Sequence, residues 1–213
     1  MNANTKAVSV AGPAGAIECA VDLPAAPHAD ALLGTAVICH PHPQQGGTMD
    51  NKVVMTIARA ALQLGWRTVR FNFRGVGSSE GTFDEGNGEA LDLQSVVREF
   101  APEGPLALAG FSFGAFVTVS ALQALWSERE VRALVLVGTA ASRFQVPPLP
   151  VESHERALVI HGEKDETVPL GAALDWARPQ SLPITVVPGV EHFFHGQLPL
   201  LKTLVMRHLR SLG

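Results

Sequence analysis

Short apolar runs alternate along the chain with longer segments in which apolar residues recur every three or four positions. The runs lie at residues 35–39, 68–73, 106–109, 131–137, 157–160 and 184–187. The periodic segments begin near residue 50 and continue at residues 93–100, 115–125, 170–177 and 201–212. Short continuous apolar runs are typical of strands buried on both faces of a parallel sheet, and a 3.6-residue period is typical of covering helices. The alternation therefore predicts an α/β fold with a mostly parallel central sheet and helices on both faces.

The first thirty residues show a different pattern. Two β-branched stretches, Ala7–Val10 and Ala16–Val21, flank the sequence Gly-Pro-Ala-Gly at residues 12–15. Glycine and proline between two strand-like segments are typical of a tight turn. We therefore expect an antiparallel hairpin at one edge of the sheet.

One long apolar segment has a second interpretation. Residues 105–126 contain no charged side chain, and Gly110 and Gly114 have the spacing of a GxxxG motif, so the segment is long enough to span a bilayer as a helix. Its flanks carry glutamates or mixed charges rather than a basic excess that would set an orientation. The pattern therefore favours a buried strand, a turn and a packed helix.

Composition narrows the class of protein. The chain has 213 residues, a net charge of −4 and no cluster of lysine and arginine, so we expect one domain without nucleic-acid or anionic membrane partners. Its amino terminus lacks a basic start followed by an apolar core, which favours a cytoplasmic location. Cys19 and Cys39 lie in apolar runs where free buried thiols are common. The sequence does not determine an oligomeric state.

The sequence Gly-Phe-Ser-Phe-Gly at residues 110–114 is a candidate nucleophile elbow. A sharp strand-to-helix turn holds a serine in a strained conformation with its hydroxyl exposed, and the flanking glycines remove side chains that would clash. Chance produces GxSxG often, so the motif depends on its position between an apolar run and a helical segment. That position predicts Ser112 as a nucleophile.

A serine nucleophile needs a base and a group that orients the base. Candidate acids Glu163, Asp165 and Glu166 follow one apolar run, and His192 and His195 follow the last one. The carboxyl ends of parallel strands share one edge of the sheet, so these side chains converge near Ser112. His192 is favoured over His195 because it comes immediately after the strand and turn.

Four segments resemble the α/β-hydrolase superfamily, in particular small bacterial hydrolases that lack a cap domain. They are the elbow, HPHP with Gly-Gly at residues 40–47, FRGVGSSEG at residues 73–81 and HGEKDETVP at residues 161–169. The resemblance covers the chain from about Thr35 to Leu212 and implies an α/β-hydrolase fold without a lid domain. The order serine, acid, histidine is also that of the superfamily.

The resemblance implies a cofactor-independent serine hydrolase with Ser112 as nucleophile, Asp165 as orienting acid and His192 as base. Asp165 is favoured over its glutamate neighbours because it matches the HGxxDxxVP pattern. The implied activity is hydrolysis of small or medium acyl esters, as in a carboxylesterase. Thioesterase or peptidase activity with the same residues, or a binding module of this fold without turnover, are the alternatives.

Acyl transfer also needs amides that hold an oxyanion. Phe113 supplies the first because it follows the nucleophile. Pro41 and Pro43 have no amide hydrogen, so the HPHP stretch offers His42, with Gln44 as the next possibility.

Side chains near the elbow are candidates for substrate binding. Phe111, Phe193 and Gln44 are predicted to contact substrate, although core packing explains the phenylalanines equally well. His40 and His42 have a spacing that suggests metal ligands, but no third ligand is evident, and we predict no metal and no cofactor. Arg74 is expected to pair with Asp92 or Glu80 rather than to bind substrate.

Overall fold

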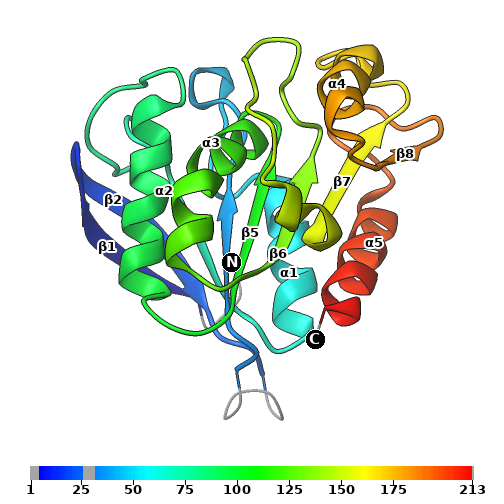
Figure 1. Ribbon diagram of the computed structural model, residues 1–213. Coiled ribbons are helices and arrows are strands. Elements are labelled where there is room, and N and C mark those ends of the chain that lie inside the picture. Colours follow the sequence, from blue (N-terminus) through cyan, green and yellow to red (C-terminus); the bar gives the residue numbers. More distant parts are fainter. Residues whose placement is uncertain (1–4, 26–31, 213) are drawn as a thin grey trace.

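The computed structural model describes residues 5–25 and 32–212 and has one eight-stranded sheet, in the order β1-β2-β4-β3-β5-β6-β7-β8 (Figure 1). The strands are β1 (Lys6–Gly12), β2 (Gly15–Asp22), β3 (Thr35–Cys39), β4 (Arg67–Phe71), β5 (Leu106–Phe111), β6 (Val131–Val137), β7 (Ala157–Gly162) and β8 (Ile184–Val187). Strands β3 to β8 pair in parallel. The predicted α/β architecture is confirmed.

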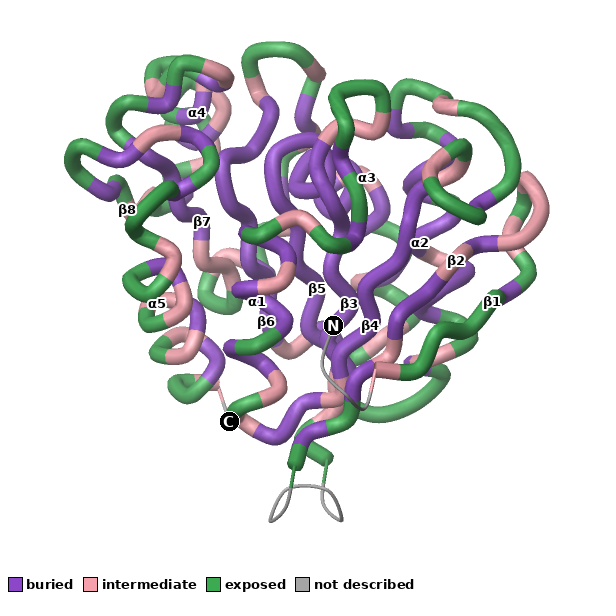
Figure 2. Tube along the Cα trace, turned by 180° about the vertical axis from the view of Figure 1, so that it is seen from behind, coloured by how far each residue is buried: buried purple, intermediate pink, exposed green. Residues whose placement is uncertain are grey.

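Helices cover both faces of this sheet (Figures 1 and 2). They are α1 (Lys52–Gln63), α2 (Asn87–Phe100), α3 (Phe113–Glu128), α4 (Leu170–Ala177) and α5 (Leu198–Ser211). Within the described residues, the connections contain the short 3-10 helices η2 (Pro43–Gln45), η3 (Val151–Arg156) and η4 (Arg178–Gln180). Helices α2 and α3 pack on one face, and α1 and α5 pack on the other.

The side-chain alternation of the central strands divides the core into two layers. In β3, Val37 and Cys39 face α2 and α3, whereas Ala36 and Ile38 face α1 and α5. The two cysteines of the chain, Cys19 and Cys39, are free and buried, and burial raises the pKa of each thiol to about 12. Both faces of the central strands are therefore buried, as their continuous apolar sequences predicted.

The amino-terminal hairpin forms one edge of the sheet. Strands β1 and β2 pair antiparallel from Lys6 opposite Val21 to Gly12 opposite Gly15, and β2 continues antiparallel against β4. Gly15 has a φ of 116°, which a residue with a side chain rarely adopts. The expected antiparallel edge is confirmed.

The charge-free segment at residues 105–126 forms β5, a one-residue turn and most of α3 rather than one long helix. Within the described ranges, no helix is long and apolar enough to cross a membrane. The elbow serine therefore stands at the point where a buried strand gives way to a buried helix.

Candidate active site

Ser112 occupies the turn between β5 and α3 with a strained backbone, at φ 57° and ψ −116°. Its amide donates to the carbonyl oxygen of Val137 at 2.8 Å. A β-carbon at Gly110 would collide with the backbone of Gly114, and one at Gly114 would collide with the carbonyl oxygens of Cys39 and His40. The two glycines are therefore required by close approach of three backbone segments, as the elbow interpretation predicted.

A continuous chain of hydrogen bonds joins the three predicted polar residues. Ser112 Oγ lies 3.0 Å from Nε2 of His192, and Nδ1 of His192 lies 2.6 Å from Oδ2 of Asp165. All three side chains are nearly buried. They come from the carboxyl ends of β5, β7 and β8, so the sheet brings together residues that are 27 and 80 positions apart in sequence.

The Asp165 carboxylate is fixed by the loop that follows β7. Its Oδ1 accepts from the amides of Thr167 at 3.0 Å and Val168 at 2.7 Å. Buried His161 lies beneath it, with Nε2 2.8 Å from the carbonyl oxygen of Val168 and 3.5 Å from Oδ2 of Asp165. Because a carbonyl only accepts, the proton of His161 is on Nε2. Burial lowers the pKa of His161, so it remains a neutral donor.

The imidazole of His192 is supported from the protein side. The ring of Phe111, fully buried in β5, lies 4.9 Å from the ring of His192. Gly138 has a φ of 55°, and a β-carbon there would lie 3.1 Å from Cε1 of His192. Phe111 therefore supports His192 and does not line the cavity, which corrects its prediction as a substrate contact. Phe193 is exposed, with its ring 5.1 Å from that of His192, and its contact with substrate stays a prediction.

A cavity of about 120 Å³ opens beside Ser112. Its lining residues are Pro41, His42, Gln45, Gly46, Gly47, Asn51, Ser112, Thr167, His192 and Phe193. The predicted contact Gln44 is exposed and is not among them, because the turn of η2 brings Gln45 to the cavity instead. A second, more open cavity of about 380 Å³ shares Thr167, His192 and Phe193 and extends towards Lys164 and Glu191.

Fully buried His40 fixes the start of the loop between β3 and α1. Its Nε2 accepts from the amide of Phe73 at 3.0 Å, so its proton is on Nδ1, 2.6 Å from the carbonyl oxygen of Pro41. Burial lowers the pKa of His40 to about 4, which keeps the ring neutral. Both of its nitrogens are thus occupied. Among the described residues, no three side chains gather as metal ligands would.

His42 follows in the same loop, with its ring packed against aromatic neighbours. The ring centroid lies 4.9 Å from that of Phe83 and 5.1 Å from that of Phe113, and burial lowers its pKa. Its carbonyl accepts from the amides of Gln45 and Gly47, and its own amide belongs to the loop that lines the cavity. Phe113 is the first residue of α3, and the amide of a first helical residue has no acceptor within the helix.

The expected pairing of Arg74 is confirmed, and a side chain beside the cavity caps a helix. Arg74 pairs with Asp92, with Nε 2.9 Å from Oδ2 and Nη2 2.8 Å from Oδ1. Asn51 opens helix α1, because its side chain accepts from the amide of Val53.

Several residues that shape the site were missed from sequence. Thr167 and Val168 act through backbone amides, for which only the aspartate two and three residues earlier gives a signal. Gly138 has a weaker signal, since it is a glycine directly after a strand at the edge where the site lies. Nothing in the adjacent pair of glutamines indicates that Gln45 rather than Gln44 lines the cavity.

Comparison with known proteins gives close structural relatives. An α/β serine hydrolase without a lid from Xanthomonas campestris is 40% identical with a TM-score of 0.85, covering 99% of this chain and 96% of its own. An α/β serine hydrolase homologue from Coxiella burnetii is 36% identical with a TM-score of 0.76, covering 96% and 97%. An uncharacterized curated protein of Rickettsia prowazekii is 28% identical over 200 residues, 86% of this chain and 79% of that one. No family model matches.

Proposed function

The chain belongs to the α/β serine hydrolases without a lid, and from that premise we propose that it hydrolyses small or medium acyl esters through Ser112, His192 and Asp165. The observation that carries the proposal is the hydrogen-bond chain from Ser112 through His192 to Asp165, at 3.0 and 2.6 Å. A serine hydroxyl becomes a useful nucleophile when a base accepts its proton in this geometry.

In the proposed acylation step, Ser112 Oγ bonds to the acyl carbon while its proton passes to Nε2 of His192. The tetrahedral intermediate collapses, the carbon–oxygen bond of the ester breaks, and His192 returns the proton to the departing alcohol. Water then bonds to the acyl carbon while its proton passes to His192. The bond from that carbon to Ser112 Oγ breaks, His192 returns the proton to Ser112, and the carboxylic acid leaves. Asp165 holds Nδ1–H of His192 throughout and stabilises the imidazolium that forms at each step.

The oxyanion of each tetrahedral intermediate requires two donors. We assign these to the backbone amides of Phe113 and His42. Phe113 has the first amide of α3, and His42 lines the cavity together with Ser112. Substitution of a side chain leaves a backbone donor in place, so the assignment is tested through residues that position the loop.

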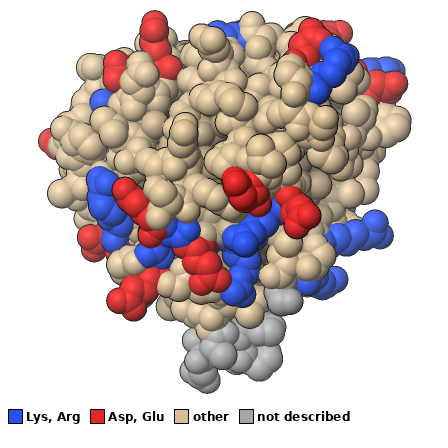
Figure 3. All heavy atoms as spheres, in the orientation of Figure 1, with Lys and Arg blue, Asp and Glu red and all other residues tan. Residues whose placement is uncertain are grey.

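The shape of the site favours a short acyl group. The cavity of about 120 Å³ lies against the β3–α1 loop, where the acyl group would meet the proposed donors. The more open cavity lies on the His192 side, where the leaving alcohol receives its proton. On the face seen in Figure 3, charged side chains gather over the lower half and along the upper rim and leave the middle mostly uncharged. None of the described residues that line the smaller cavity is a lysine, arginine, aspartate or glutamate. These features support neutral esters as substrates.

The proposal is tested with a fluorophosphonate probe and with p-nitrophenyl esters and matched thioesters of two to twelve acyl carbons. We expect the wild type to be labelled at Ser112 and to turn over short esters fastest. Ser112→Ala is expected to lose labelling and at least 10⁴-fold in kcat, because the nucleophile is absent. Ser120→Ala removes a hydroxyl that donates only to the carbonyl oxygen of Phe116 on α3, and serves as the matched control.

Unlabelled, folded wild type would contradict the proposal and favour a binding module of this fold. Equal labelling of Ser112→Ala and wild type would also contradict it. Thioesters hydrolysed much faster than the matched esters would retain the mechanism and change the substrate class.

A further inference from the structure

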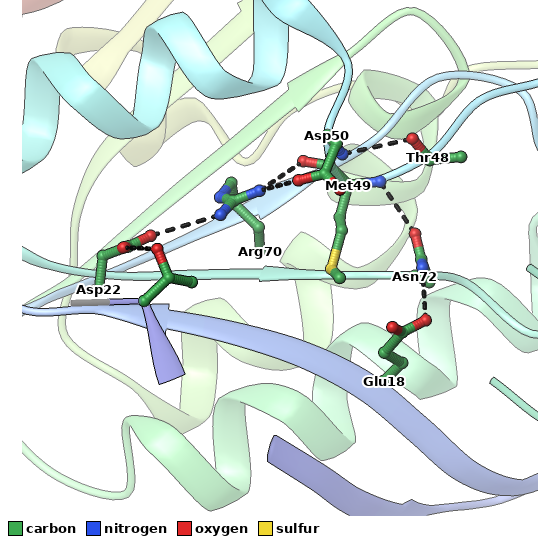
Figure 4. Close-up of polar contacts among 8 residues, drawn as sticks. Glu18, Asp22, Thr48, Met49, Asp50, Arg70 and Asn72 are labelled. Carbon is green, nitrogen blue, oxygen red and sulfur yellow. Dashed lines mark hydrogen bonds and ion pairs between the residues drawn. The ribbon is translucent and has the colours of Figure 1, made fainter. Parts of the chain in front are cut away.

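Arg70 of β4 is a charged side chain with no contact to the reacting residues, and its side chain is fully buried. Its Nη1 donates to Oδ1 of Asp50 at 2.8 Å and to the carbonyl oxygen of Met49 at 2.9 Å, and its Nη2 lies 3.4 Å from Oδ2 of Asp22 (Figure 4). Burial of a guanidinium is costly unless its partners are well placed. Two of these partners lie in the β3–α1 loop, which points to a role there.

Asn72 adds a second contact to the same loop. Its Oδ1 accepts from the amide of Met49 at 2.9 Å, and its Nδ2 donates to Oε2 of Glu18 on β2 at 2.7 Å (Figure 4). The amide and the carbonyl of Met49 are therefore both held by side chains that lie two residues apart at the end of β4. The amide of the next residue, Phe73, donates to His40. The β3–α1 loop is thus fixed at both of its ends to β4 and the two residues that follow it.

Backbone contacts carry this restraint from Met49 towards the cavity. Gly47, two residues before Met49, donates its amide to the carbonyl oxygen of His42 at 3.0 Å. A β-carbon at Gly47 would collide with the carbonyl oxygen of Pro41, so this segment is seated directly against the peptide whose amide belongs to His42. The position of the His42 amide therefore depends on the contacts that hold residues 47–49.

We infer that Asn72 and Arg70 are positioning residues that hold the His42 amide in place for the oxyanion, acting through Met49 and Gly47. The inference rests on the proposed function, since it takes that amide as the second donor. Neither side chain touches the substrate or the reacting atoms. Their effect is on the transition state, because a donor displaced by about 1 Å can cost up to about 10²-fold in rate while the ground state remains bound.

Asn72→Ala tests the inference most directly. We expect kcat for a short p-nitrophenyl ester to fall about 10- to 100-fold with KM within about threefold of wild type. Inhibition by a short alkyl trifluoromethyl ketone, whose adduct with serine carries an oxyanion, is expected to weaken by the same factor as kcat. All assays are run where thermal melting shows the variant to be folded.

Asp50→Ala provides a second variant that keeps β4 intact. The Asp50 side chain is 54% exposed, so its removal leaves the core unchanged while it breaks one of the two contacts between Arg70 and the loop. We expect a smaller fall in kcat, of about three- to tenfold, again matched by the trifluoromethyl ketone. Hydrogen–deuterium exchange of the peptide that covers residues 40–49 is expected to accelerate in both variants, which gives a readout independent of activity.

Arg67→Met is the matched control, because Arg67 is also an arginine of β4 but donates to Thr35, at the start of β3. It is expected to leave kcat, ketone inhibition and loop exchange within twofold of wild type. The inference is overturned if folded Asn72→Ala and Asp50→Ala keep wild-type kcat and ketone inhibition, or if Arg67→Met shows the same losses. An inactive wild type, or an active Ser112→Ala, would instead overturn the proposed function and with it this role.

Discussion

Two buried polar networks hold different walls of the cavity beside Ser112. The Asp165 network comprises Ser112, His192, Asp165, His161 and the amides of Thr167 and Val168. The Arg70 network comprises Glu18, Asp22, Met49, Asp50, Arg70 and Asn72. The first joins Ser112 to the carboxylate of Asp165 through two hydrogen bonds, whereas the second contains no reacting group in the proposed mechanism.

The two networks also differ in how their charges are balanced. Asp165 accepts from the amides of Thr167 and Val168, and no lysine or arginine among the described residues pairs with it. In the proposed mechanism its charged partner is the imidazolium of His192 that forms during reaction. Arg70 is compensated at rest by Asp22 and Asp50. One network is therefore arranged for a charge that appears during turnover, and the other for a charge that never changes. Disruption of the first should cost mainly rate, whereas disruption of the second should also cost stability.

The largest expected effect comes from Asp165→Asn. The Asn oxygen can still accept from the amides of Thr167 and Val168, but the amide group no longer accepts from Nδ1 of His192, which favours the wrong tautomer. We expect kcat to fall about 10⁴-fold with the free energy of unfolding changed by less than about 1 kcal/mol. Single-turnover acylation and urea unfolding measure the two quantities. A loss below tenfold would show that the carboxylate does not orient the base.

The next largest effect is expected for Arg70→Met in urea unfolding. Loss of the guanidinium leaves the carboxylate of Asp22 buried without its cation, which costs about 3 to 5 kcal/mol of unfolding free energy. The double variant Asp22→Asn with Arg70→Met removes the unpaired charge and is expected to recover much of that loss. A single variant as stable as wild type would remove the distinction between the two networks.

The smallest expected effect is a loss of stability as the pH falls. Below pH 6.5 the unfolded chain binds a proton at residue 40 that the folded chain does not bind until about pH 4. The contribution of His40 to the free energy of unfolding is therefore fully present above pH 6.5, and about 3 kcal/mol of it is lost as the pH drops to 4. His40→Gln cannot titrate, so its unfolding free energy should depend less steeply on pH across this window. Equal slopes for the variant and wild type would show that His40 is not buried in its neutral form.

Much of the fold and the site could be predicted because their signals are local. Continuous apolar runs located the central strands, and the position of Ser112, Asp165 and His192 after three of them followed from the shared edge of a parallel sheet. The misassignments arose where the signal depends on backbone detail. Phe111 ends β5 on the same face as Ala107 and Ala109, and that alternation directs it under His192.

The Arg70 network shows what sequence alone does not reveal. Arg70 stands between Val69 and Phe71 in a strand and carries no motif. Its carboxylate partners Asp22 and Asp50 are 48 and 20 positions away, on another strand and in a loop. Only the register of β2 on β4 and the path of the β3–α1 loop bring them together. A buried charge surrounded by distant partners is therefore a property of the assembled fold.

The two buried thiols report local unfolding of this protein, because each reacts only when its surroundings open. Since burial raises the pKa of Cys19 and Cys39 to about 12, neither is a thiolate at neutral pH, and both are closed to an alkylating reagent in the folded state. Cys19 lies on β2 near the sheet edge, and Cys39 ends the central strand that leads into the loop beside the cavity. Alkylation timed at each site by mass spectrometry would therefore separate fraying of the edge from opening of the centre, with no label added to the chain.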